Sequence, residues 1–349
     1  MTDQAVPRAV IVLVGTAGAF VTLFGMREIA SILGPIVLAL VLVIAVSPVR
    51  SWLGERRAPA WLQVAVPFLI VVLVLLGMVA ILTLSATQLA SILPGYSPQF
   101  QRLVTQAQQL VTDLGVSNEQ LNKAIQSFDP GKLIGFAQGL ATGLLGVLSS
   151  LFLIVVLLLA MSLDAPVTAR IINAGRERRP QMVTALATFA SKTRRYLIVS
   201  TVFGLICSAL DVTALYFLSV PLPLLWGVLA LITNYIPNVG FVLGLIPPAT
   251  LALLDGGLKQ MILVIVAYMA INVVIQSFIQ PKFLGDAVGL STTMTFLSLI
   301  VWAFVLGPLG ALLAIPLSLL TRALLIDSDP SAGWAAALIS GEDPVPEQR

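Results

Sequence analysis

Long apolar stretches separated by short charged linkers dominate the first half of the chain. A helix needs about 20 mainly apolar residues to cross the hydrocarbon core of a bilayer. Four stretches satisfy this requirement, namely Ala9–Met26, Ile29–Val49, Ala60–Leu84 and Leu140–Leu163. We therefore predict four membrane-spanning helices here, and we interpret the first as retained because no small-x-small cleavage site follows it.

A polar segment with helical periodicity separates the third span from the fourth. Apolar residues recur at helical spacing over Phe100–Leu114, which predicts an amphipathic helix. Ser117 and Gln120 form a capping box for a second short helix, while Asp129 and Pro130 are typical of the start of a third, which continues into the fourth span. We expect the apolar stripes to pack these helices on one another; a partner-binding or membrane-surface face is the alternative.

Two segments of the second half are apolar and yet rich in helix breakers. The run Val212–Leu254 has no charged residue, but its part Thr233–Pro248 contains three prolines, two glycines and two asparagines. A second uncharged run, Ala287–Thr321, is interrupted at Gly307–Gly310 and at Pro316. Proline removes an amide donor, and glycine and asparagine favour non-helical backbone, so neither run forms one regular helix. Each either crosses the membrane with a break or turns back as a re-entrant hairpin.

Broken helices at membrane depth indicate transport sites, because the freed amides and carbonyls must face protein or a watery cavity. A fifth span, Tyr196–Ser219, precedes the first broken segment, and an ordinary span, Gln260–Ile279, separates the two. The predicted fold class is an all-α polytopic membrane protein with about eight membrane segments, two of them broken or re-entrant, and a small helical extracytoplasmic insert. The expected parts are an N-terminal three-helix membrane part (1–84), the insert (85–139), the fourth span (140–163), a basic cytoplasmic loop (164–195), a C-terminal membrane domain (196–326) and an acidic cytoplasmic tail (327–349).

The composition supports a membrane protein and removes several classes of function. Hydrophobic residues make up 58% of the chain and charged residues 10%, whereas globular domains carry about 25% charged residues. The net charge of +3 is too small to predict nucleic-acid binding, and the absence of histidine excludes histidine metal sites and Ser-His catalysis. The chain has no G-x-x-x-x-G-K phosphate loop, and we interpret the single cysteine, Cys207, as a buried apolar residue. We expect no enzymatic activity, no cofactor and no metal.

Basic residues determine the expected orientation. Arg50, Arg56 and Arg57 follow the second span, and residues 164–195 hold seven Lys or Arg against two acidic residues. The positive-inside rule assigns both segments to the cytoplasm. We therefore expect a protein of the bacterial inner membrane with both termini in the cytoplasm and the helical insert outside.

Polar side chains within the apolar segments are the candidates for a transport pathway. Asp211 is the one acidic residue well inside a span, which suits a proton or cation site; a position near the outer interface is the alternative. Asn272, Gln276 and Gln280 are spaced by four, so they form a stripe that either binds a polar solute or hydrogen-bonds neighbouring helices. The full set of candidates is Asp211, Asn234, Pro237, Asn238, Gly240, Asn272, Gln276, Gln280, Pro281, Gly285, Gly307, Gly310 and Pro316.

Three short segments carry a family resemblance. They read I-P-N-V-G-F-V-L-G-L-I-P-P at Ile236–Pro248, Q-P-K-F-L-G-D-A-V-G-L at Gln280–Leu290 and L-G-P-L-G-A-L-L-A-I-P at Leu306–Pro316. With these segments in this order, the chain resembles the autoinducer-2 exporter family of PerM-like permeases over nearly its whole length. It departs from the family's pattern at Ile275, where a glutamate is common, and at residues 291–292, where His-Pro is frequent.

The resemblance implies a passive or ion-coupled permease that forms a homo-oligomer, with family members linked to export of a small sugar-like signal or to sodium/proton exchange. Our leading hypothesis is a membrane transporter, a permease or exporter, for a small polar solute, with the two broken segments forming its site. The first alternative is a sodium (cation)/proton antiporter that uses Asp211. The second is a non-transporting membrane scaffold that acts through residues 99–128.

Overall fold

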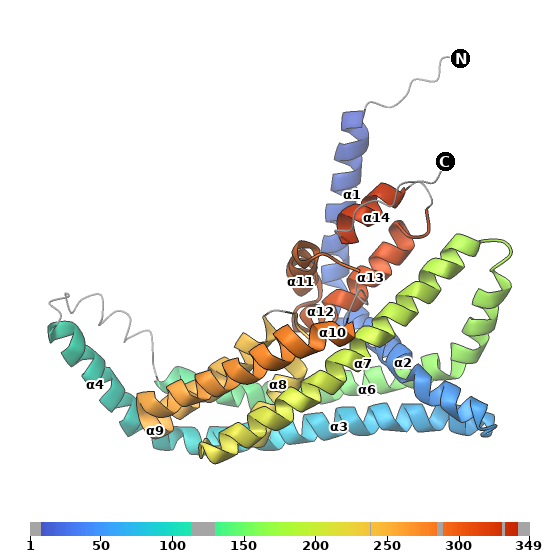
Figure 1. Ribbon diagram of the computed structural model, residues 1–349. Helices are drawn as coiled ribbons and strands as arrows, with labels where there is room; N and C mark the ends of the chain where they lie inside the picture. The colour runs from blue at the N-terminus through green and yellow to red at the C-terminus, as the bar shows by residue number, and fades with distance from the viewer. Residues whose placement is uncertain (1–7, 114–129, 238, 285–288, 330–331, 341–349) are drawn as a thin grey trace. The chain divides into compact units, whose positions relative to one another are not determined.

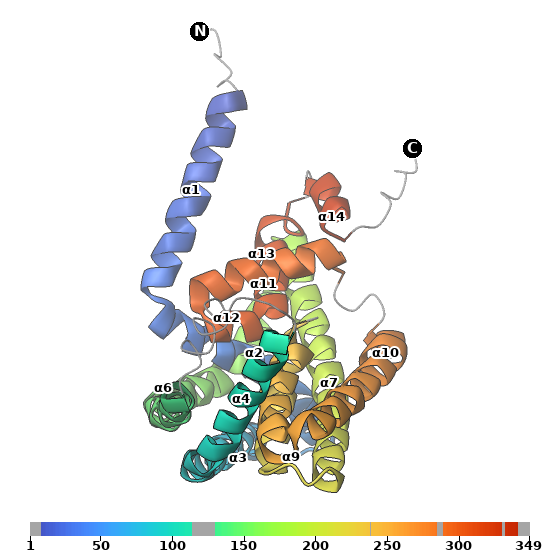
Figure 2. The ribbon, with the colours of Figure 1, turned by 90° about the vertical axis from the view of Figure 1, so that its left-hand side faces the viewer.

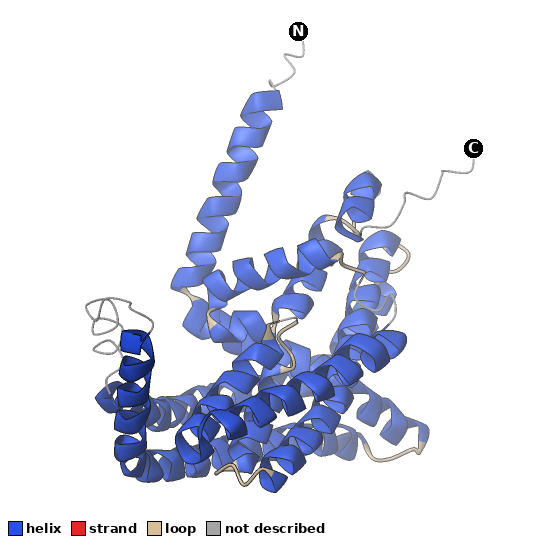
Figure 3. Ribbon diagram, turned by 60° about the vertical axis from the view of Figure 1, so that its left-hand side comes forward, coloured by secondary structure: helices blue, strands red, loops and turns tan. Residues whose placement is uncertain are grey.

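The computed structural model describes residues 8–113, 130–237, 239–284, 289–329 and 332–340. Within these residues the chain is helical and no strand occurs (Figure 3). The second insert helix expected near residues 117–128 lies outside the described residues, as do Asn238 and Gly285. The all-α fold class is confirmed for the part of the chain that the structure describes.

The helices follow one another along the chain as labelled in Figure 1. Their bounds are α1 Arg8–Glu28, α2 Ala30–Glu55, α3 Ala60–Ile92, the short 3-10 helix η1 Leu93–Tyr96, α4 Ser97–Asp113, α6 Pro130–Ala174, α7 Pro180–Phe217, α8 Pro223–Thr233, α9 Gly240–Asn272, the π-helix η2 Val273–Ile279, α10 Gln280–Leu284, α11 Thr292–Leu306, α12 Pro308–Leu312, α13 Ala314–Leu325 and α14 Gly333–Ser340.

Five helical stretches of the described residues are long and apolar enough to cross a membrane. They are Ala30–Glu55, Ala60–Gln106, Leu151–Ala174, Pro180–Phe217 and Gly240–Ile279. Three shorter apolar helices, α8, α11 and α13, belong to the two segments that the sequence identifies as broken. The protein is therefore a multi-pass membrane protein.

Several helices extend well beyond the apolar spans that the sequence delimits. α6 continues to Ala174, past the end of the fourth span at Leu163, and α7 begins at Pro180, before its apolar part begins at Tyr196. Lys and Arg are good helix formers, and a proline in the first helical turn costs no hydrogen bond. Hydropathy shows only where the apolar residues end. The helical backbone of α6 continues beyond that point to the turn that contains Gly175, and α7 begins after this turn.

The helices form two compact units, each assembled from stretches that are distant in sequence. Unit 1 comprises Met1–Phe68, Ile154–Tyr196 and Asp286–Arg349, and unit 2 comprises Leu69–Leu153 and Leu197–Gly285. The two broken segments fall in different units, α8 and α9 in unit 2 and α11 to α13 in unit 1.

In unit 2 the first broken segment is a helical hairpin formed by α8 and the first half of α9. A Cβ atom on Gly244 would lie 3.4 Å from Cα of Ala230, and one on Gly240 would overlap the carbonyl of Thr233, so the two helices run side by side in opposite directions. Small residues at such a crossing let the helix backbones approach closely. The turn between the helices contains Pro237, which cannot continue a helix because it lacks an amide donor.

α9 is itself divided at Gly257. This residue has φ 74° and ψ −168°, a conformation that is essentially restricted to glycine. No atom outside its immediate neighbours lies within 4 Å of the position that a Cβ would take, so its conformation, and not lack of space, requires glycine here. The first half of α9 therefore ends at Gly257, and the second half is a separate helix that continues into the π-helix.

We expect Gly257→Ala to destabilise the protein by about 1–3 kcal/mol, because alanine is strained at this φ/ψ pair. The measurement is thermal unfolding in detergent, and the expected result is a lower Tm. Gly25→Ala in α1 is the matched control, since Gly25 lies inside a regular helix with no atom near its Cβ position. An unchanged Tm for Gly257→Ala would show that the two halves of α9 do not need this break.

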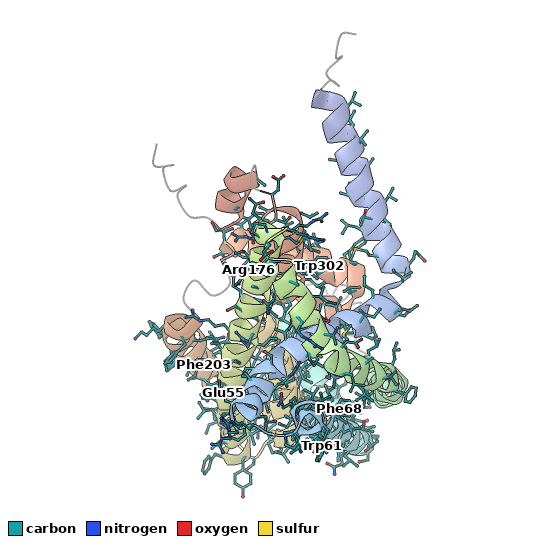
Figure 4. All side chains as sticks on the ribbon, turned by 90° about the vertical axis from the view of Figure 1, so that its right-hand side faces the viewer. Glu55, Trp61, Phe68, Arg176, Phe203 and Trp302 are labelled. Carbon is teal, nitrogen blue, oxygen red and sulfur yellow. The ribbon has the colours of Figure 1, made fainter. Side chains whose placement is uncertain are left out.

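In unit 1 the second broken segment is also a helical hairpin, formed by α11, α12 and α13, which lie together in Figure 2. Gly307, with φ 64° and ψ −144°, ends α11 and begins α12. A Cβ on Gly310 would overlap the carbonyl of Trp302, the residue labelled in Figure 4. The Trp302 Nε1–H donates to Ser318 Oγ of α13 at 2.9 Å. Pro316 is fully buried in this hairpin.

Candidate functional site

Three amide side chains form a connected cluster in unit 2, where α8 ends and α9 passes into the π-helix. Asn234 follows the last residue of α8 and donates from Nδ2 to the Ser200 carbonyl of α7 at 3.0 Å. Gln276 donates from Nε2 to two acceptors, Oδ1 of Asn234 and Oδ1 of Asn272, each at 2.8 Å. Asn272 in turn donates from Nδ2 to the Tyr268 carbonyl at 2.8 Å. The cluster thus ties the hairpin turn to both α7 and α9.

Some donors and acceptors of this amide cluster are hydrogen-bonded within the protein, and others are free. Both hydrogens of the Gln276 amide are engaged, and Asn234 and Asn272 each use one donor and the oxygen. Among the described residues nothing donates to Gln276 Oε1. Asn272 is buried, with 7% of its surface exposed, while Asn234 and Gln276 are half-buried. Within the described part of the chain, the cluster therefore keeps three free groups: the acceptor Oε1 of Gln276, one N–H of Asn234 and one N–H of Asn272.

Gln276 lies within the π-helix η2, which the sequence did not reveal. In a π-helix each amide bonds to the carbonyl five residues earlier, and such turns are frequent at functional sites. The wider turn changes the angle between residues spaced by four. Gln280, at the end of η2, makes no hydrogen bond to the cluster among the described residues, although the α-helical spacing predicts one continuous stripe. Ile275, which stands where the family commonly has a glutamate, is buried against Phe203 and Cys207 of α7.

Small and hydroxyl-bearing residues of α7 complete the surroundings of the amide cluster. A Cβ on Gly204 would lie 2.8 Å from Asn234 Nδ2, so the absence of a side chain makes room for the amide. The Thr201 hydroxyl donates to the Leu197 carbonyl at 2.6 Å, and therefore the Tyr235 hydroxyl, 2.7 Å away, donates to Thr201 Oγ1. These α7 residues were not among the sequence candidates. Their signal is a row of small residues spaced by four, namely Ser200, Gly204 and Ser208.

Asp211 lies elsewhere on α7, in the apolar interior of unit 2. Only 1% of its surface is exposed, and among the described residues its Oδ1 atom has no hydrogen-bond partner. The carboxylate interacts electrostatically with the Cys207 thiol and the Tyr268 hydroxyl. Tyr268, also 1% exposed, likewise has no partner for its hydroxyl. No group of three His, Cys, Asp or Glu side chains that could hold a metal ion occurs in the described residues.

The remaining candidates divide among several places. Pro237 is half-buried in the hairpin turn, and Gly240 is buried at the start of α9. Pro281 lies in α10, and Gly307, Gly310 and Pro316 lie in the hairpin of unit 1. The structure thus brings Asn234, Asn272 and Gln276 together through hydrogen bonds, whereas neither Asp211 nor Gln280 makes a hydrogen bond to that cluster among the described residues.

Unit 1 holds one further polar feature, at the end of the segment that reads Q-P-K-F-L-G-D-A-V-G-L. Gly289 has φ 57°, and its carbonyl accepts a hydrogen bond from Nη1 of Arg322 in α13. Nε of Arg322 also pairs with Asp327 Oδ1 at 3.1 Å. A cavity of about 380 Å³ adjoins this contact, and Lys192 of α7 contributes to its lining. α13 therefore anchors the described end of this segment.

Comparison with known proteins identifies the family. A family model described as AI-2E family transporter matches residues 10–327. The chain belongs to the AI-2E transporter family. The resemblance inferred from the three short segments is thereby confirmed.

Relatives of this AI-2E family member align over most of their length. The AI-2 transport protein TqsA of Escherichia coli strain K12 is 30% identical over 305 residues, which cover 87% of this chain and 88% of TqsA. YhhT of the same strain is 28% identical over 313 residues, 88% of each protein. A protein of Haemophilus influenzae is 28% identical over 343 residues, 95% of this chain and 97% of its own length. Because the chain belongs to the AI-2E transporter family, it is a membrane transporter.

Proposed function

We propose that the chain moves a small, uncharged polar solute across the membrane, and that the amide cluster of unit 2 recognises this solute. The observation that carries the proposal is the convergence of Asn234, Asn272 and Gln276 at a break in the helical backbone. Interrupted helices buried in protein are where membrane transporters bind their substrates.

The chemistry of the cluster supports a neutral, hydroxyl-rich solute. Carboxamides offer donors and acceptors together, which match a hydroxyl group in either role. The Tyr235 and Thr201 hydroxyls next to the cluster extend the same chemistry. No charged side chain takes part in these hydrogen bonds, so a charged solute would lose its hydration without gaining a counter-charge, which costs several kcal/mol. A sugar-like molecule fits this pattern, and the similarity to TqsA, an AI-2 transport protein, supports a solute of the AI-2 kind.

The arrangement in the cell is part of the same proposal. The basic residues of the segment 164–195 support a cytoplasmic location for both termini in a bacterial inner membrane. We further propose a homo-oligomer that carries out transport without catalysing a reaction. Neither feature enters the recognition chemistry of the amide cluster.

Two alternative functions keep specific support. Cation/proton exchange at Asp211 is favoured by a fully buried carboxylate with an unpartnered oxygen. A scaffold acting through residues 99–128 would use the insert, of which α4 is amphipathic and mostly polar on its exposed side. Family membership favours transport over the scaffold.

The specificity of the wild-type protein tests the proposal. In proteoliposomes loaded with a radiolabelled neutral sugar-like solute, neutral polyols should compete for efflux, and the matched phosphorylated compounds should compete at least about tenfold less well. The reason is that the amide cluster offers no compensating charge. Equal competition by neutral and phosphorylated compounds would contradict recognition by amides alone.

A further inference from the structure

α7 and the second half of α9 run antiparallel through unit 2, with contacts at both ends of the shared stretch. At one end Gln260 donates from Nε2 to the Leu218 carbonyl at 2.6 Å. At the other end Phe203 and Cys207 of α7 pack against Ile275. Asp211 precedes Leu218 by two turns, and Tyr268 follows Gln260 by two turns, so this register sets the two side chains opposite each other.

The surroundings of Asp211 and Tyr268 are apolar. Leu215 and Val264, one turn along each helix, have no exposed surface and belong to one buried cluster with Tyr268. Neither the carboxylate Oδ1 nor the phenol oxygen has a hydrogen-bond partner among the described residues. An unpaired charge in such an interior is costly, so the carboxylate needs either a cation or a proton.

The available ligands distinguish a proton from a metal cation. A hard cation in a protein site takes about six oxygen ligands. Around Asp211 the structure provides its own carboxylate and the Tyr268 hydroxyl, together with the Cys207 thiol, which is a poor ligand for sodium, calcium or magnesium. The Ser208 hydroxyl is already engaged with the Gly227 carbonyl at 2.8 Å. A proton needs no such set of ligands, so the side chains around Asp211 fit a proton better than a metal cation.

The titratable groups near Asp211 on the packed elements are few. α7 brings Cys207 and α9 brings Tyr268. α8, which packs on α7 at Ser208, carries no titratable side chain, and neither does α3, which contributes Leu89 to the core. Tyr96 of η1 also borders this core, but its hydroxyl donates to Asp255 at 2.8 Å. Among the described residues, Asp211 is therefore the one carboxyl that faces this interior.

We propose that Asp211, with Tyr268 opposite it on α9, is the proton-carrying site of the transporter and couples solute movement to a proton gradient. One proton binds to a carboxylate oxygen from water on one side of the membrane and leaves to water on the other side, with no other bond made or broken. The Tyr268 phenol, whose oxygen has no hydrogen-bond partner among the described residues, can accept from the protonated carboxyl or donate to the ionised carboxylate when the two side chains approach.

The connection to the solute site is short. The carbonyl of Tyr268 accepts a hydrogen bond from Asn272, whose oxygen accepts from Gln276. A change at Asp211 that moves Tyr268 is thus transmitted to the amide cluster within one helical turn. This coupling rests on the proposed solute site, whereas the proton site itself does not.

Proteoliposomes with an imposed pH difference test the inference. One proton per solute gives up to about a tenfold solute gradient for a pH difference of one unit. The wild type should build this gradient and move protons, as read by an internal pH dye, and a sodium gradient should have no effect. Asp211→Asn should keep downhill solute flux but lose both the gradient and the dye signal. Tyr268→Phe should keep the coupling ratio and shift the pH profile of flux.

Several outcomes would overturn the inference. Wild-type coupling in Asp211→Asn would do so, as would wild-type flux driven by sodium and not by protons. The dye reports proton movement without any solute. A failure to find a transported solute would therefore count against the proposed function, whereas the dye signal would still decide whether Asp211 carries a proton. Infrared difference spectroscopy on the wild type provides a check independent of folding in the variants: a protonated-carboxyl band should appear as pH falls and be missing in Asp211→Asn.

Discussion

Proteoliposomes that carry Gln276→Leu are expected to move less than about one tenth of the solute that wild-type vesicles move. Leucine has a similar size but removes both donors, so Oδ1 of Asn234 and Oδ1 of Asn272 lose their partner. Leaving a buried acceptor unsatisfied costs about 1–3 kcal/mol, and two acceptors are affected. The measurement is initial efflux of the neutral solute at equal protein per vesicle.

Ser277→Ala is the matched control for Gln276→Leu. Ser277 neighbours Gln276 in the same π-helix, but it is exposed and takes no part in the amide cluster. Flux through Ser277→Ala should equal that of the wild type. Normal flux through Gln276→Leu would show that the amide cluster only holds helices together and that the solute passes elsewhere.

Gly240→Ala should abolish transport and greatly reduce the yield of folded protein. A Cβ at this position would overlap the carbonyl oxygen of Thr233, and backbone atoms cannot move aside as a flexible side chain can. The hairpin of α8 and α9 would have to open, and Asn234, the next residue after Thr233, would leave Gln276. Size-exclusion chromatography in detergent and flux of the neutral solute measure the two effects.

The control for Gly240→Ala is Gly77→Ala in α3. Gly77 lies within a regular helix, and no atom outside its own helix lies within 4 Å of its Cβ position. This substitution should leave flux unchanged and stability equal or slightly higher, since alanine favours a helix by about 1 kcal/mol. Folded, active Gly240→Ala protein would mean that α8 and α9 separate in the functional molecule.

Much of the architecture follows from the sequence, because membrane helices have simple requirements. Length and hydropathy indicate the spans, and the prolines and glycines of Thr233–Pro248 and Gly307–Gly310 mark the places where the two hairpins turn. These features are local: a proline lacks its donor wherever it stands. The sequence did not decide between a broken crossing and a reversal, which depends on contacts such as Gly244 with Ala230.

The candidate site was only partly predictable, because hydrogen-bond partners are a property of packing. Asn234, Asn272 and Gln276 were identifiable as polar residues in apolar segments. Gln276 contacts Asn272, four positions away, and Asn234, 42 positions away, and only the second contact needs the tertiary fold. The partners on α7 give a weak signal, since serine and glycine are common in membrane helices. The π-helix has no sequence signature, and the stripe that the sequence predicts over Asn272, Gln276 and Gln280 stays a prediction at Gln280, which makes no hydrogen bond to the cluster among the described residues.

The two glycines pressed against backbone carbonyls, Gly240 in unit 2 and Gly310 in unit 1, limit how the sequence can vary. Relatives at 28–30% identity have exchanged most side chains, and lipid-facing positions accept such exchange as long as they stay apolar. A position that cannot hold a Cβ has no such freedom, whichever solute is carried. Substrate preference can therefore diverge among relatives through the side chains around each turn, whereas the two glycines within the turns cannot be replaced by a larger residue.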